Sequence, residues 1–170
     1  GMDSDGVAGS PLIALKAVSD ALEMNRDRLS PYVRVNLYFN DIDQSVISKL
    51  KNVLLKQKYD DNRISMVCSS KPFHVCYNSF ASRKDGILRQ DGSANFLFID
   101  QFGVKEVSQE IFHDMQQISR TDFMFFIAAS IVNRMHNHPS IKDKIPVLTE
   151  EETQSINAKN VVRILADAYK

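Results

Sequence analysis

The stretch that most constrains the fold of this chain is residues 94–103, which read ANFLFIDQFG. A short run of branched and aromatic residues, with DGS before it and a glycine after it, predicts a buried β-strand. A strand of this composition is expected to be covered by helices on both faces. Its carboxyl end then places Asp100 at the edge where open α/β sheets bind their ligands. The stretch therefore favours an α/β fold with a nucleotide-type site.

The segments on either side of this strand alternate between strand and helix periodicity. Alternating or continuous apolar residues predict three further strands, over residues 33–39, 64–68 and 123–128. Apolar residues at helical spacing predict helices over residues 11–25, 44–57, 109–118 and 149–170, and a short helix within residues 77–90. This order predicts a three-layer, Rossmann-like fold, in which a mostly parallel sheet of about four strands carries helices on both faces.

Several residues have the sequence pattern of helix starts. Ser10 before Pro11 is typical of an N-cap followed by a first-turn proline. Asp43 and Ser108 each precede an apolar helical stripe and are predicted to be N-caps. The sequence TEEE from Thr149 onward predicts a capping box.

The length of 170 residues fits one α/β domain over residues 1–170. Residues 1–9 read as an N-terminal loop whose Gly1 is typical of tag removal, and residues 147–170 as a helical C-terminal segment. Acidic and basic residues number 21 each, so net charge does not indicate a nucleic-acid partner.

No membrane partner is expected either. The longest apolar run, residues 123–132, is too short to span a bilayer, and no signal peptide is recognisable. The two cysteines do not form a disulfide framework, which favours reduced thiols in a cytoplasmic protein.

An acid at the end of the strand over residues 33–39 is the first candidate for chemistry. In nucleotide-binding α/β folds an acid at this place accepts hydrogen bonds from ribose hydroxyls. Asp41 is the candidate, with Asn40 beside it. The alternative is that Asp41 and Asp43 only cap the following helix.

The second candidate is the run Asp100, Gln101, Phe102 and Gly103 after the central strand. Its acid could orient a substrate amine or hydroxyl, and its aromatic ring could stack on a planar group. The glycine would let the backbone turn tightly. The alternative is a strand-to-helix turn with a capping acid.

We expect no metal site. Cys68, His74 and Cys76 offer soft ligands, but their spacing matches no zinc pattern and a fourth ligand is not evident. His136 and His138 stand in a predicted loop beside a proline, where a solvated loop is the simpler interpretation.

Three short blocks together resemble a known family. They are GSPLIAL over residues 9–15, FNDID over residues 39–43 and FIDQFG over residues 98–103. In this order they resemble blocks of the three-Cys-motif partner proteins, which are similar to class I S-adenosylmethionine-dependent methyltransferases. The resemblance covers most of residues 6–135, and its most specific block is D-x-F-G after a buried strand.

The resemblance implies roles for individual residues. Asp41, with Asn40 beside it, would bind the ribose of S-adenosylmethionine. The turn formed by residues 69–70, which are Ser69 and Ser70, would lie by the adenine. Residues 100–102, which are Asp100, Gln101 and Phe102, would sit beside the transferable methyl group as the catalytic turn.

Two departures from the family pattern stand out. Gln101 occupies the position where the family has proline. The family's first strand and glycine loop, which hold the methionine part of the cofactor, would precede residue 6, and its last strands would follow residue 170. We therefore expect an incomplete methyltransferase fold, in a fragment, a shortened reading frame or a degenerate relative. An open sheet of this kind could recruit a protein partner or form a homodimer.

Two functions follow as hypotheses. The first is an S-adenosylmethionine-dependent methyltransferase-like domain with an unknown acceptor, which could be inactive in this shortened form. The second is a non-catalytic protein-interaction module that retains the Rossmann-like fold.

Overall fold

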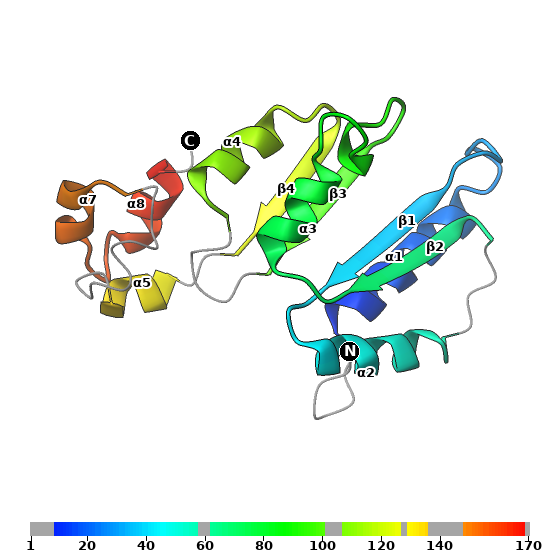
Figure 1. Cartoon of the computed structure of the whole chain (residues 1–170), viewed down its shortest axis with the longest axis horizontal. Coiled ribbons are helices and arrows are strands. Elements are labelled where there is room, and N and C mark those ends of the chain that lie inside the picture. The colour runs from blue at the N-terminus through cyan, green and yellow to red at the C-terminus, as the bar shows by residue number, and fades with distance from the viewer. Residues whose placement is uncertain (1–8, 58–61, 101–106, 127–128, 136–147, 169–170) are drawn as a thin grey trace. The chain divides into compact units, whose positions relative to one another are not determined.

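The computed structural model describes residues 9–57, 62–100, 107–126, 129–135 and 148–168 (Figure 1). This part of the chain combines helices with parallel strands, so the predicted α/β class is confirmed. The chain divides into two compact units, residues 1–76 and 77–170, and each contains one pair of strands. None of the helices in the described residues has both the length and the apolar character needed to cross a membrane.

Among its described residues, the first unit contains two complete helices and one parallel strand pair. Its elements are α1 (Ser10–Met24), β1 (Val35–Asn40), α2 (Gln44–Leu54) and β2 (Ile64–Ser69). β1 and β2 run parallel, with Val35 opposite Ile64 and Asn40 opposite Ser69. Because the register is parallel, the carboxyl ends of both strands lie at the same edge of the sheet.

One face of this sheet carries the core of the first unit. Leu12, Leu15 and Leu22 of α1 and the α2 residues Leu50 and Leu54 are buried in it. Alternate strand residues pack against this core: Val35, Leu37 and Phe39 of β1, with Ile64, Met66 and Cys68 of β2. Both helices therefore cover the same face, which is why β1 alternates between half-buried and exposed residues.

The second unit continues from α3 (Phe73–Phe80), a helix that spans the division between the units. It contains a 3-10 turn (Ile87–Arg89), β3 (Asn95–Ile99), α4 (Gln109–Gln116) and β4 (Thr121–Phe125). β3 and β4 are parallel, with Asn95 opposite Thr121 and Ile99 opposite Phe125. Its remaining described helices are α5 (Ala129–Met135), α7 (Glu150–Ser155) and α8 (Val161–Ala168).

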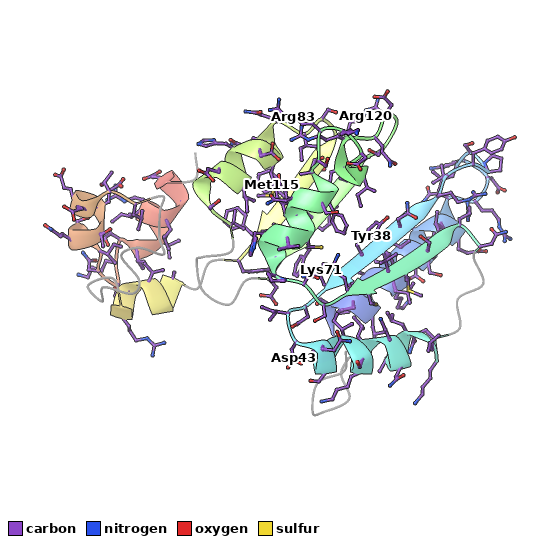
Figure 2. All side chains as sticks on the ribbon, in the orientation of Figure 1. Tyr38, Asp43, Lys71, Arg83, Met115 and Arg120 are labelled. Atoms are coloured by element: carbon purple, nitrogen blue, oxygen red, sulfur yellow. The ribbon has the colours of Figure 1, made fainter. Side chains whose placement is uncertain are left out.

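Helix α4 packs against the β3–β4 pair through aromatic contacts. The Phe112 ring lies edge-on to the rings of Phe123 and Phe125, at centroid distances of 5.6 and 6.0 Å. Met115, one turn further along α4, is completely buried (Figure 2). A separate cluster joins α5 to α8 and to the segment between α7 and α8, and contains Val132, Ile156, Val161 and Leu165.

The predicted three-layer, Rossmann-like sheet of about four strands with helices on both faces is not confirmed. The described strands form two sheets of two strands each, β1 with β2 and β3 with β4. The sequence patterns identified each strand but could not fix the pairing, because pairing depends on contacts between segments far apart in the chain.

The predicted helix caps are confirmed except at the first helix. The side chains of Asp43 and Ser108 accept hydrogen bonds from backbone N–H groups of their helices, and the capping box of Thr149 is present. At α1 the N-cap is Gly9 rather than Ser10, because the Gly9 carbonyl already accepts hydrogen bonds from the N–H groups of residues 12 and 13.

Two helices differ most from the predictions. The short helix expected within residues 77–90 begins earlier, at Phe73, directly after Pro72. The helix expected over residues 149–170 is interrupted after Ser155, where Ile156 adopts an extended conformation. The Asn157 N–H then donates to the Asn160 side chain at 2.8 Å, which stabilises a turn in place of a continuous helix.

Candidate functional site

The candidate site is the edge of the first unit where β1 and β2 end. The structure brings together there all four residues predicted to bind a cofactor: Asn40 and Ser69 are the last residues of β1 and β2, and Asp41 and Ser70 follow them. Figure 2 labels Asp43 and Lys71, which follow the same two strand ends. Parallel pairing is the cause, because it places residues that end successive strands next to each other.

Asn40 joins the two strand ends. Its side-chain Oδ1 accepts hydrogen bonds from the Ser69 hydroxyl at 2.7 Å and from the Lys71 N–H at 3.2 Å. Its Nδ2 donates to the Lys71 carbonyl at 2.9 Å. An amide side chain offers two donors and two acceptor positions, so three of the four are committed to the protein. The Asn40 side chain therefore links the ends of β1 and β2.

The two acids after β1 have different roles. Asp43 is the N-cap of α2, and its Oδ1 accepts a hydrogen bond from the Ser45 N–H at 2.7 Å. Hydrogen bonds from Ser45 hold the pKa of the Asp43 carboxyl below its usual value. Asp41 does not cap the helix: its Oδ1 accepts from the Asp43 N–H at 2.8 Å. This bond orients a half-buried carboxylate, whose second oxygen makes no hydrogen bond within the part of the chain that the structure describes.

The two serines contribute acceptors to the same edge. The Ser69 hydroxyl donates to Asn40, and the Ser70 hydroxyl donates to the Ile42 carbonyl at 3.0 Å. Both hydroxyl hydrogens are therefore used within the protein, and the oxygens keep lone pairs. Together with the Asp41 carboxylate, they form an edge rich in hydrogen-bond acceptors, which suits a ligand that presents hydroxyl or amino donors.

The Cys76 thiol also reaches this edge. Burial raises the pKa of the Cys76 thiol above the ordinary value for a thiol, and the nearby Ser69 hydroxyl partly offsets this rise. The sequence singled out Cys76 only as a weak metal ligand, because its approach to Ser69 depends on where α3 begins. Within the described residues no group of three histidine, cysteine or acidic side chains could hold a metal ion. His136 and His138 lie outside these residues.

The predicted catalytic turn is described only at its first residue. Asp100 follows β3 and is exposed. Gln101 and Phe102 lie outside the described residues. Asp100 belongs to the second unit, whereas the four predicted cofactor-binding residues belong to the first.

A second polar cluster, which the sequence did not predict, lies within the second unit. The Tyr77 hydroxyl donates to Asp114 Oδ2 at 2.7 Å, and an Arg89 guanidinium nitrogen donates to Asp114 Oδ1 at 2.5 Å. The Arg89 Nε also donates to the Ala81 carbonyl at 2.7 Å. These bonds tie α3, the 3-10 turn and α4 together. A hollow of about 200 Å³ beside them is lined by Tyr77, Asn78, Glu110, Ile111 and Asp114.

The Tyr77 phenol gives this cluster a pH dependence that can be tested. Burial, followed by the hydrogen bond to Asp114, raises the pKa of Tyr77 above its usual value. The unfolded chain ionises this phenol near pH 10, whereas the folded chain still holds its proton. The contribution of Tyr77 to the free energy of unfolding is therefore complete below about pH 10. Above that pH it falls by up to about 1.4 kcal/mol per pH unit. Urea unfolding above about pH 10 tests this: the free energy of unfolding of Tyr77→Phe should fall less steeply with pH than that of the parent chain. Equal slopes for the two chains would contradict a raised pKa of Tyr77.

No protein-family model, no curated protein and no solved structure matches this chain.

Proposed function

We propose that this chain is an S-adenosylmethionine-dependent methyltransferase-like domain, in which the carboxyl ends of β1 and β2 hold the nucleoside part of the cofactor. The observation that carries the proposal is the Asp41 carboxylate. It follows a parallel strand, it is held in direction by the Asp43 N–H, and its other oxygen makes no hydrogen bond to the described residues. An acid in this position binds ribose hydroxyls in nucleotide-binding α/β folds.

The chemistry of the edge fits a nucleoside. A ribose presents two neighbouring hydroxyl donors, and the edge presents the Asp41 carboxylate for them. The lone pairs of Ser69 and Ser70 fit an exocyclic amine, such as that of adenine. The bonds made by Asn40 keep the two strand ends at a fixed separation before a ligand arrives, which lowers the cost of ordering the site.

We also propose that the strands belong to a Rossmann-like sheet and that residues 100–102 form the catalytic turn. Parallel strands with intervening helices are the building blocks of a Rossmann-like sheet with helices on both faces. Asp100, Gln101 and Phe102 would then orient the methyl acceptor. Methyl transfer needs the acceptor in line with the sulfonium methyl group, so positioning by these residues would supply most of the catalysis.

Titration calorimetry with S-adenosylmethionine and with its demethylated product tests the ligand site. Asp41→Asn is expected to weaken binding about tenfold to a hundredfold, because a carboxylate accepts hydrogen bonds more strongly than an amide. The variant keeps an oxygen that can accept from the Asp43 N–H, so the fold should persist.

The matched control is Asp27→Asn, which changes an exposed acid of the same unit outside the site. It should bind like the parent chain. If Asp41→Asn and Asp27→Asn bind S-adenosylmethionine with equal affinity, Asp41 does not belong to the binding site. The absence of binding by a folded parent chain would overturn the proposed cofactor.

The alternative is a non-catalytic interaction module, and one observation favours it. Each described sheet has only two strands, so every strand has one edge without a neighbouring strand among the described residues. Such edges are templates for pairing with a partner or with a second copy. A folded chain that binds neither S-adenosylmethionine nor its demethylated product, but forms dimers in sedimentation velocity, would support this alternative.

A further inference from the structure

An aspartate followed by a glycine is a point where a protein backbone can rearrange without an enzyme. The backbone nitrogen of the glycine, which no neighbouring side chain shields, can attack the Cγ atom of the aspartate and close a five-membered ring. The sequence contains three such Asp–Gly pairs, at residues 5–6, 85–86 and 91–92. The first pair lies outside the described residues, and the other two lie in the second unit. Two chemically identical pairs can therefore be compared within one unit.

The pair formed by Asp85 and Gly86 is held by hydrogen bonds. The Gly86 N–H donates to the Ser82 carbonyl at 2.9 Å. The Asp85 Oδ1 accepts from the Ser82 hydroxyl at 2.7 Å. Gly86 is also buried, and the backbone of Phe80 and Ser82 lies close against it. Both groups that would react are therefore engaged in a crowded turn.

The pair formed by Asp91 and Gly92 is open. The Ser93 N–H donates to the Gln90 carbonyl at 3.2 Å, and Gly92 has a φ of 80°, which together define a type II turn. Both residues of the pair are exposed, and nothing lies within 4 Å of the position that a Gly92 Cβ would occupy. Within the described residues, neither the Gly92 N–H nor the Asp91 carboxylate makes a hydrogen bond. No contact in this part of the chain therefore restrains the two groups that would react.

We propose that Asp91 is a site of spontaneous isoaspartate formation, and that the fold protects the chemically identical Asp85. In the first step the Gly92 nitrogen bonds to the Asp91 Cγ and gives up its proton, and the protonated carboxyl group loses its hydroxyl. One water leaves and a succinimide ring forms. In the second step one water cleaves the bond between the Gly92 nitrogen and the main-chain carbonyl carbon of Asp91. The chain then runs through the Asp91 side chain, and the free carboxylate is carried by Cα.

This chemistry is balanced without a further reactant, because the water lost in the first step equals the water added in the second. Cleavage of the other ring bond restores aspartate, so the product is a mixture of the two forms. The inference does not rest on the cofactor site proposed above.

Isoaspartate would change the turn that leads into β3. The Asp91 Cβ would become part of the main chain and lengthen the turn by one backbone atom. The turn is closed by the N–H and the hydroxyl of Ser93, which both donate to the Gln90 carbonyl, the hydroxyl at 2.7 Å. Across the same turn, the Asn95 Nδ2 donates to the Leu88 carbonyl at 2.9 Å. The modification would therefore alter the junction between the 3-10 turn and β3.

Peptide mapping of the full chain tests the proposal. Trypsin cleaves after lysine and arginine, so the three Asp–Gly pairs fall in different peptides, residues 1–16, 85–89 and 90–105. The chain is incubated at mildly acidic pH, both folded and in guanidinium chloride. Electron-transfer fragmentation then identifies isoaspartate in each peptide. In the folded chain, isoaspartate should accumulate at position 91 at least about tenfold faster than at position 85, because reaction at Asp85 must first break two hydrogen bonds. In guanidinium chloride the two positions should react at similar rates.

Variants assign the signal and the protection. Asp91→Glu should abolish the new species in residues 90–105, because glutamate would have to close a six-membered ring, which forms far more slowly. Asp85→Glu is the matched control and should leave the rate at position 91 unchanged. Ser82→Ala removes the hydroxyl that binds the Asp85 carboxylate, and should raise the rate at position 85 about threefold to tenfold.

Three results would overturn the proposal. One is a similar rate at positions 85 and 91 in the folded chain. Another is isoaspartate at position 91 in guanidinium chloride but not in the folded chain, which would show that the folded turn prevents the attack. The third is an unchanged rate at position 85 in a folded Ser82→Ala variant, which would remove the protection assigned to the Ser82 contact.

Discussion

Replacing Asp114 by alanine is expected to lower the free energy of unfolding by about 2 to 3 kcal/mol. The substitution removes the acceptor of both the Tyr77 hydroxyl and the Arg89 guanidinium. Tyr77 is buried, and the Arg89 side chain is only 21% exposed, so water replaces the lost acceptor incompletely. The Asp114 side chain is 33% exposed, which keeps the expected loss below that of a fully buried ion pair.

Urea unfolding followed by far-ultraviolet circular dichroism measures this loss. Asp114→Asn should cost less than Asp114→Ala, because the amide oxygen can still accept from Tyr77 while the charge is lost. Asp91→Ala is the control: Asp91 is an exposed turn residue, and its change should stay within about 0.5 kcal/mol. Equal losses at Asp91 and Asp114 would show that the cluster contributes nothing to stability.

Local features of this chain could be predicted because their causes are local. The side chain of Asp43 lies two residues from the Ser45 N–H that it accepts from. The alternation in β1 follows from one buried and one exposed face. The edge formed by Asn40, Asp41, Ser69 and Ser70 was also predictable, because the ends of successive parallel strands meet at one edge.

The remaining features depend on contacts that short sequence windows do not contain. Tyr77 and Asp114 are 37 positions apart, so no periodicity connects them. The link that Asn40 makes between the two strand ends could be recognised only from the position of Lys71 in space. The pairing of strands into two sheets is also nonlocal, which explains why strand identity was predicted and sheet composition was not.

The close backbone contact at Gly86 is another feature that could not be predicted from the sequence. A Cβ atom at this position would collide with the backbone of Phe80 and Ser82. The Gly86 N–H also donates to the Ser82 carbonyl at 2.9 Å, and its own carbonyl accepts from the Arg89 N–H at 3.1 Å. The turn that carries Arg89 to Asp114 therefore requires glycine for its close approach.

Replacing Met115 by alanine is expected to have the largest effect on stability, about 2 to 5 kcal/mol. Met115 is completely buried in α4, the helix that covers the inner face of the β3–β4 sheet. Alanine removes three heavy atoms and leaves a cavity, and Phe112 on the same helix is already fixed by its ring contacts with the strands. The surroundings can therefore relax only partly, so the cost exceeds that of transferring the side chain to water.

The matched control is Met24→Ala, which makes the same chemical change at a side chain that is 84% exposed. It should alter the free energy of unfolding by less than about 0.5 kcal/mol, because no cavity forms. Urea midpoints of the two variants give the comparison directly. A loss at Met115 no larger than that at Met24 would contradict its burial under α4. Met115→Leu keeps most of the side-chain volume and should recover most of the loss, since swaps that conserve volume usually cost less than about 1.5 kcal/mol.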